Sequence, residues 1–95
     1  YKVIGVAPTA EKALRIINEQ KPDIAVVDIR LRGGMDGISV GRVLREKLNI
    51  PFIYVSGSTD KATIDRALET APAGYLTKPV RENDLRAAMR AALAE

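Results

Sequence analysis

The sequence predicts a single α/β domain built on a parallel sheet, and three observations lead to this prediction. Short β-branched apolar runs alternate with helical apolar stripes along the chain. Residues 24–29 read Ile-Ala-Val-Val-Asp-Ile, a run without polar alternation that is typical of a strand covered by helices on both faces. The length of 95 residues allows one core and excludes two.

The elements are expected in the order β-α-β-α-β-α-β-α. Strands are predicted at residues 1–7, 24–29, 50–56 and 74–77, where β-branched or aromatic apolar residues gather. Four helices follow them, and their apolar stripes are Ala10, Ala13, Leu14 and Ile17; Val40, Val43, Leu44 and Leu48; Ile64, Ala67, Leu68 and Ala71; and Leu85, Ala88, Met89, Ala92 and Leu93. Thr9 is expected to cap the first helix, and Pro22 and Pro72 to follow helix ends. Strict alternation of this kind implies right-handed crossovers between parallel strands.

Composition excludes several classes of function. A net charge of +3, from 15 basic and 12 acidic side chains, is too small to favour a nucleic-acid or membrane surface. The chain contains no cysteine and no histidine, which rules out disulfides, thiolate metal sites and histidine-based catalysis. We see no membrane-spanning run or signal peptide, so a soluble, cytoplasmic protein is expected. The chain starts at Tyr1 inside an apolar run, which predicts a piece of something longer.

Three polar residues follow or end the predicted strands. Asp28 lies near the end of the second strand, Ser56 at the end of the third, and Lys78 directly after the fourth. In an open parallel sheet, ligands bind outside the carboxyl ends of the strands. Alone, an Asp, a Ser or a Lys-Pro at such a place is most often a turn or loop residue. Together they favour a site in which Lys78 offsets the desolvation of Asp28.

Four motifs at these places resemble the receiver domain of bacterial two-component response regulators. They are Val26-Val27-Asp28, Met35-Asp36-Gly37, Val55-Ser56-Gly57 and Gly74-Tyr75-Leu76-Thr77-Lys78-Pro79. The resemblance runs over all 95 residues, and its most specific part is the aromatic residue three positions before Lys-Pro. It implies a flavodoxin-like, doubly wound parallel sheet. It also implies a phosphoprotein of a two-component phosphorelay, phosphorylated by a sensor histidine kinase or a histidine phosphotransferase.

The resemblance also implies roles for individual residues. Asp28 would be the phosphorylation site, forming an aspartyl phosphate. Ser56 and Lys78 would bind phosphoryl oxygens, and Gly57 would leave room for them. The domain itself would be a signalling phosphoacceptor and not an enzyme.

The remaining implied roles concern the metal and the switch. Magnesium would be held by Asp28 and the backbone carbonyl of Arg30. Its other acidic ligands are not in this chain. Tyr75 would be the aromatic switch residue that moves with Ser56, and Lys78–Pro79 would be a cis peptide. The output surface is expected on the third helix, the last strand and the last helix.

The largest departure from the family is at the front of the chain. Tyr1 corresponds to the start of the family's second strand, so the first strand with its acidic pair and the following helix, roughly 30 residues, are missing. Either these residues exist in the real molecule or the sheet closes the gap. Closure would place the first three helices on one face and the last helix on the other. We expect the second face then to be half bare, exposing Val, Ile and Leu and favouring a homodimer.

Two alternatives remain open beside the phosphoacceptor. One is a pseudo-receiver, an interaction module that is never phosphorylated, although the presence of Asp28, Ser56 and Lys78 weighs against it. The other is a flavodoxin-like domain that binds a small ligand or cofactor, because fold does not fix function. The chain has neither Gly-x-Gly-x-x-Gly nor a Walker motif, which weighs against a nucleotide.

Overall fold

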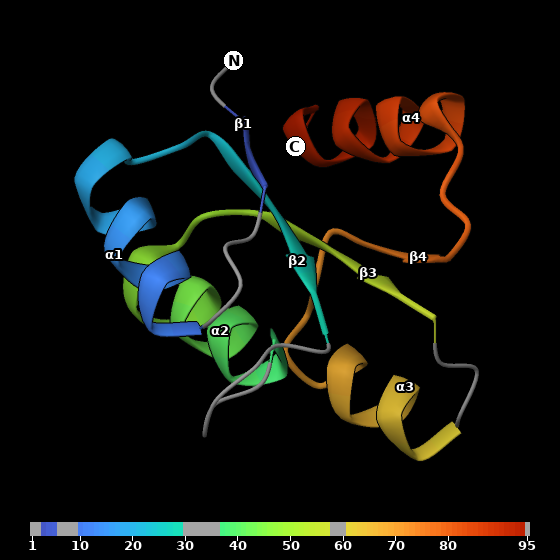
Figure 1. Ribbon diagram of the computed structural model, residues 1–95, viewed down its shortest axis with the longest axis horizontal. Coiled ribbons are helices and arrows are strands. Elements are labelled where there is room, and N and C mark those ends of the chain that lie inside the picture. Colours follow the sequence, from blue (N-terminus) through green and yellow to red (C-terminus); the bar gives the residue numbers. More distant parts are fainter. Residues whose placement is uncertain (1–2, 6–9, 30–36, 58–60, 95) are drawn as a thin grey trace.

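A computed structural model describes residues 3–5, 10–29, 37–57 and 61–94 (Figure 1). Its strands and helices are β1 (Val3–Gly5), α1 (Ala10–Gln20), β2 (Ile24–Asp28), α2 (Gly37–Val43), β3 (Phe52–Ser56), α3 (Lys61–Leu68), β4 (Gly74–Thr77) and α4 (Glu82–Leu93). One π-helical segment, η1 (Leu44–Leu48), directly continues α2. The predicted alternation of strands and helices is therefore confirmed. The predicted cap, Thr9, lies outside the described residues.

The four strands form one parallel sheet in the order β1-β2-β3-β4. Register pairs include Ile4 with Ala25 and Val26 with Ile53, and Val55 pairs with Leu76. Strand β1 pairs directly with β2. All strands run the same way, so β2, β3 and β4 deliver their last residues to a single edge of the sheet.

The larger hydrophobic core lies between the sheet and the first three helices. Its side chains come from β2, β3, α1, α2, η1 and α3, and the largest include Ile17, Val27, Leu44, Phe52 and Tyr54. Phe52 and Tyr54 are both buried, and their rings meet edge to face with centroids 5.2 Å apart. The three helices share one face, as right-handed crossovers between consecutive strands require.

The second core lies under α4, on the opposite face of the sheet (Figure 1). Ile24, Ile53 and Ala92 are buried there. Val26 and Val55, farther along the same face, are half-buried. The expected exposed patch is thus wrong for the described residues, because α4 lies across β2, β3 and β4 and shields them.

Helix ends are marked by three non-glycine residues in the left-handed region. Lys21 follows α1, Asn49 follows η1 and Ala71 lies past α3, with φ of 47°, 52° and 53°. The Asn49 and Ile50 N–H groups both donate to the Leu44 carbonyl, the latter at 3.0 Å. This pattern satisfies a carbonyl that the helix end would otherwise leave unpaired.

The third helix differs from its predicted stripe. Ala67 is its one buried residue, whereas Leu68 is 52% exposed and Ala71 lies beyond its end. Helix α3 packs mainly against α2, so a narrower strip of its surface is covered. The spacing of apolar residues therefore predicted correctly that this segment is a helix, but it predicted only part of the buried face.

Candidate functional site

Asp28 and Lys78 meet at the carboxyl edge of the sheet. Asp28 is the last residue of β2, and Lys78 directly follows β4, so β3 separates their strands. Lys78 Nζ donates to Asp28 Oδ2 at 2.7 Å. The side chains are 48% and 34% exposed, respectively. The pair places a carboxylate beside an ammonium group at a position that solvent can reach.

Backbone geometry brings Lys78 to this place. Its N–H donates to the Ser56 carbonyl at 2.8 Å, which extends the pairing of β4 with β3 by one residue. The Lys78–Pro79 peptide bond is cis, as the family resemblance implies. Lys78 is thus fixed to the end of the neighbouring strand before its side chain crosses toward Asp28.

Ser56 and Gly57 lie at the end of β3, on the same edge. Ser56 is fully buried, so its hydroxyl is closed off from solvent in this conformation. Gly57 is exposed, and a Cβ at this residue would meet no atom within 4 Å. Among the described residues, nothing crowds the position next to Ser56.

Tyr75 is a half-buried aromatic residue on the edge strand β4. It pairs with Tyr54 in the register of β3 and β4. The two rings meet edge to face with centroids 6.3 Å apart. Tyr75 thus lies on the face covered by the first three helices, two register pairs before Ser56.

Gly37, to which the sequence motifs gave no role of its own, supports the site. Its N–H donates to the Ile29 carbonyl at 2.9 Å. A Cβ on Gly37 would lie 2.7 Å from Ile29 Cα and would collide with the Asp28 carbonyl oxygen. Only glycine lets the start of α2 approach the end of β2 this closely. A glycine at the boundary between a loop and a helix was the signal available in the sequence.

The described residues do not by themselves fit a magnesium site. Among them, no group of three or more histidine, cysteine, aspartate or glutamate side chains is placed to hold a metal ion. Asp28 offers one carboxylate, and Lys78 already pairs with it, whereas magnesium prefers several oxygen ligands. Arg30, whose carbonyl the resemblance implies as a ligand, lies outside the described residues.

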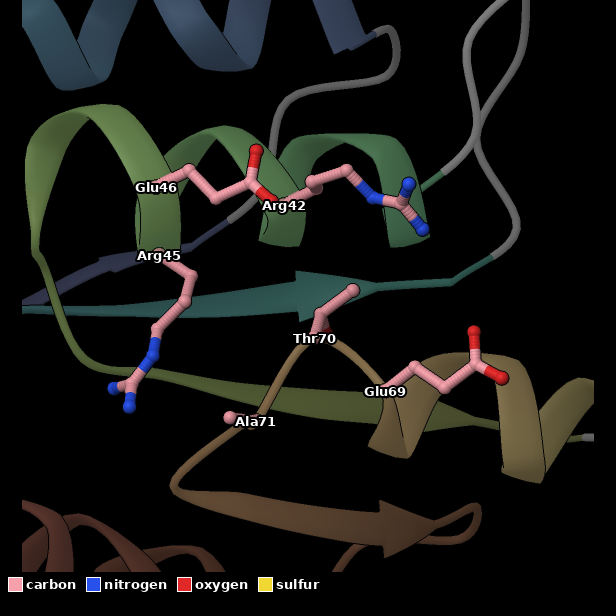
Figure 2. Close-up of a pocket in the computed structure, with 6 residues that line it drawn as sticks. All are labelled: Arg42, Arg45, Glu46, Glu69, Thr70 and Ala71. Carbon is pink, nitrogen blue, oxygen red and sulfur yellow. The ribbon is translucent and has the colours of Figure 1, made fainter.

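A separate hollow of about 320 Å³ lies between α2 with η1 and the end of α3 (Figure 2). Its lining residues are Arg42, Arg45, Glu46, Glu69, Thr70 and Ala71. Arg42, Arg45 and Glu46 lie on α2 and η1, and Glu69 lies across from them at the end of α3. The two arginines and two glutamates of the lining balance in charge. Figure 2 shows Thr70 on the inner side, on the segment that leaves α3.

In the part of the chain that the structure describes, no helix is long and apolar enough to span a bilayer.

Comparison with known proteins adds relatives that match most of this chain. Transcriptional regulatory protein AfsQ1 of Streptomyces coelicolor is 33% identical over 90 residues, which is 95% of this chain and 40% of that protein. The positive alginate biosynthesis regulatory protein of Pseudomonas aeruginosa is 37% identical over 93 residues, 97% of this chain and 37% of that protein. The chain therefore spans about two fifths of the length of these curated relatives.

Solved structures agree with the fold. The signal receiver domain of a modulated diguanylate cyclase from Desulfovibrio desulfuricans, described as an example of alternate folding, has a TM-score of 0.86 and 38% identity. The match covers 95% of this chain and 71% of that one. The BeF3-activated N-terminal receiver domain of Klebsiella pneumoniae RstA has a TM-score of 0.82 and 28% identity, with 95% and 76% covered.

A family model supports the same assignment. The model of the response regulator receiver domain matches residues 1–90, which include the strand ends that carry Asp28, Ser56 and Lys78. The fold is accordingly a flavodoxin-like α/β fold. The chain belongs to the family of response regulator receiver domains.

Proposed function

We propose that Asp28 is the phosphoacceptor of this receiver domain. The observation that carries the proposal is the solvent-accessible carboxylate of Asp28 with Lys78 Nζ at 2.7 Å. A carboxylate oxygen of Asp28 attacks phosphorus, a P–O bond forms, and the P–N bond of a phosphohistidine breaks. The electron pair of that bond stays on the imidazole of the donor. The product is an acyl phosphate on Asp28.

Lys78, Ser56 and Gly57 serve the same transfer in this proposal. The Lys78 ammonium neutralises charge on the transferred group, and its existing contact with Asp28 supports that role. The Ser56 hydroxyl binds a second phosphoryl oxygen, which requires the buried side chain to turn outward. The open space at Gly57 gives room for that group.

Magnesium is part of the proposal as the family's cofactor, with Asp28 and the Arg30 carbonyl among its ligands. When bound, it would supply positive charge for the phosphoryl oxygens. The described residues offer a single carboxylate for it, so the remaining acidic ligands lie elsewhere.

The output in this proposal is a change of surface. Ser56 and Tyr75 move together, and the two-state equilibrium of α3, β4 and α4 shifts. The partners are a sensor histidine kinase or histidine phosphotransferase on the input side, in the cytoplasm. Relatives include proteins named as DNA-binding response regulators and as a modulated diguanylate cyclase. Because these names describe different effectors, the proposal covers phosphorylation of Asp28 and names no effector.

Acetyl phosphate labelling of a form that includes the family's upstream segment before Tyr1 tests the proposal. With magnesium present, the wild-type protein should gain one phosphoryl group, and Asp28→Asn should gain none. Asp23→Asn is the matched control, because Asp23 is exposed and directly precedes the opposite end of β2. Equal labelling of Asp28→Asn and the wild type would contradict the assignment. A wild-type protein that is not labelled at all would favour the pseudo-receiver alternative.

A further inference from the structure

Two buried hydroxyl groups link β3 to the end of α3. The Tyr54 hydroxyl lies 2.7 Å from Thr70 Oγ1, and Thr70 Oγ1 donates to the Ala67 carbonyl at 2.7 Å. A threonine hydroxyl carries a single proton, so the Tyr54 hydroxyl is the donor to Thr70. Tyr54 is fully buried and Thr70 is 5% exposed. The chain of hydrogen bonds thus runs from the middle of the sheet to the last turn of α3.

The position of the Tyr54 hydroxyl is fixed from the other side by Gly41 in α2. A Cβ at Gly41 would lie 2.7 Å from Tyr54 Cζ and would collide with the hydroxyl oxygen. Helix α2 therefore leaves a space that the tyrosine ring fills. Close packing on one side and the hydrogen bond on the other leave this ring little freedom.

The rest of α3 is little buried. Ala67 is the only buried residue of the helix. Its exposed residues are Lys61, Ala62, Asp65, Arg66 and Leu68, and Thr63 and Ile64 are half-buried. The start of α3 follows Ser56 and Gly57 after a short connection. One end of α3 is therefore anchored and the other is attached to the predicted switch.

The same tyrosine ring also supports Tyr75. The rings of Tyr54 and Tyr75 are in edge-to-face contact at 6.3 Å, and Ser56 follows Tyr54 by two residues on β3. A single buried ring thus contacts the predicted switch residue and, through its hydroxyl, the end of α3.

We propose that Tyr54 and Thr70 are positioning residues that make the C-terminal end of α3 a fixed pivot. When a phosphoryl group on Asp28 draws Ser56 and Tyr75 into new positions, the start of α3 moves and its last turn stays attached to β3. This inference rests on the proposed function for the trigger. The hydrogen bonds that define the pivot are independent of it.

Amide hydrogen exchange of the intact protein, with and without beryllium trifluoride and magnesium, tests the pivot. In the wild type, the phosphate mimic should change exchange in residues 61–66 and leave residues 67–71 unchanged. Tyr54→Phe removes the hydroxyl and keeps the ring. It should accelerate exchange of residues 67–71 about tenfold without the mimic, the effect of one buried hydrogen bond. The response to the mimic should then extend into that turn.

Threonine variants separate the hydroxyl from the shape of the side chain. Thr70→Val removes the hydroxyl and with it both the contact with Tyr54 and the bond to the Ala67 carbonyl, so it should accelerate exchange at least as much as Tyr54→Phe. Thr70→Ser retains the hydroxyl and should behave like the wild type. The double variant Tyr54→Phe with Thr70→Val should exchange no faster than Thr70→Val alone, because Thr70→Val already breaks the bond between the two hydroxyl groups. The rate of labelling by acetyl phosphate should stay within about twofold in Tyr54→Phe, because Asp28 and Lys78 are unchanged.

Three outcomes would overturn the pivot. In the first, the phosphate mimic changes exchange of residues 67–71 in the wild type as much as that of residues 61–66. In the second, Tyr54→Phe exchanges at the same rates as the wild type. In the third, the effects of the two single variants on exchange add up in the double variant. Failure of the proposed function looks different, because the wild type would then show no response to the mimic and no labelling of Asp28. Exchange of residues 67–71 without the mimic would still decide whether the hydroxyl pair holds the end of α3.

Discussion

Replacing Gly37 by alanine should destabilise the protein at the point where α2 meets the phosphorylation site. The added Cβ would lie 2.7 Å from Ile29 Cα and 2.9 Å from the Asp28 carbonyl carbon. An ordinary carbon–carbon contact is about 3.5 Å, so α2 and β2 must separate by several tenths of an ångström. Both neighbours are backbone atoms and have no rotamer into which to move.

The expected cost is near the upper end of the range for overpacking, about 3 kcal/mol. That is more than a hundredfold in the ratio of folded to unfolded protein and a large part of the stability of a small domain. Gly57→Ala is the matched control, because its Cβ would meet nothing within 4 Å and its φ is not in the left-handed region. It should be neutral or stabilise by up to about 1 kcal/mol through the unfolded chain.

Urea unfolding followed by circular dichroism measures both variants. Gly37→Ala should unfold at a much lower urea concentration than the wild type, and Gly57→Ala at the same concentration or higher. Because the collision involves the backbone of Asp28, labelling by acetyl phosphate should also fall in Gly37→Ala under conditions where the protein is still folded. If the two glycine variants unfold at the same midpoint, the close approach of α2 to β2 is not a constraint and the reasoning is wrong.

Other variants test the helix ends and the ion pairs. Ala71→Gly should stabilise the folded protein by about 1 kcal/mol, since a left-handed conformation is unfavourable for alanine. Ala73→Gly is the control, because Ala73 lies on the same exposed segment without a positive φ, and it should not stabilise the protein. Urea unfolding midpoints compare the two variants, and equal midpoints would contradict this explanation. Lys78→Ala should change stability by less than about 1 kcal/mol, because its ion pair is half-exposed, yet reduce acetyl phosphate labelling at least about tenfold. Arg86→Ala breaks an ion pair of the same 2.7 Å length on α4 and should leave labelling unchanged; equal labelling of both variants would remove the case for Lys78.

The features that the sequence predicted well are those that local pattern and topology determine. The buried run at residues 24–29 identified a parallel strand, since such strands are covered on both faces. The rule that sites form at the carboxyl ends of parallel strands then brought Asp28 and Lys78 to one edge, and the structure has them in contact. The ion pair of Glu82 and Arg86 on α4, at 2.7 Å, is of the same local kind, because residues four apart are neighbours on any helix.

What the sequence missed depends on contacts between distant elements. A tyrosine in a buried strand implies a partner for its hydroxyl, but nothing in the local pattern identifies Thr70 as that partner. Leu68 fits an apolar stripe, and its exposure follows from where α3 packs. Among the described residues, β2, β3 and β4 are less bare on the second face than expected, because the 12 residues of α4 cross all three strands.

The charge of the site leads to a prediction about magnesium. In the described residues, the carboxylate of Asp28 and the ammonium of Lys78 cancel, and a hard dication is attracted by several oxygen ligands with net negative charge. The 95-residue chain should therefore bind magnesium weakly. A longer form that places the family's acidic pair before Tyr1 would carry a site charge near −2 and should bind it at least about tenfold more tightly. Calorimetric titration of both forms measures the difference, with calcium as a test of selectivity. Equal affinities would show that no carboxylate outside this chain is a ligand, and the proposed magnesium-dependent phosphorylation of Asp28 would then lack the metal site that it requires.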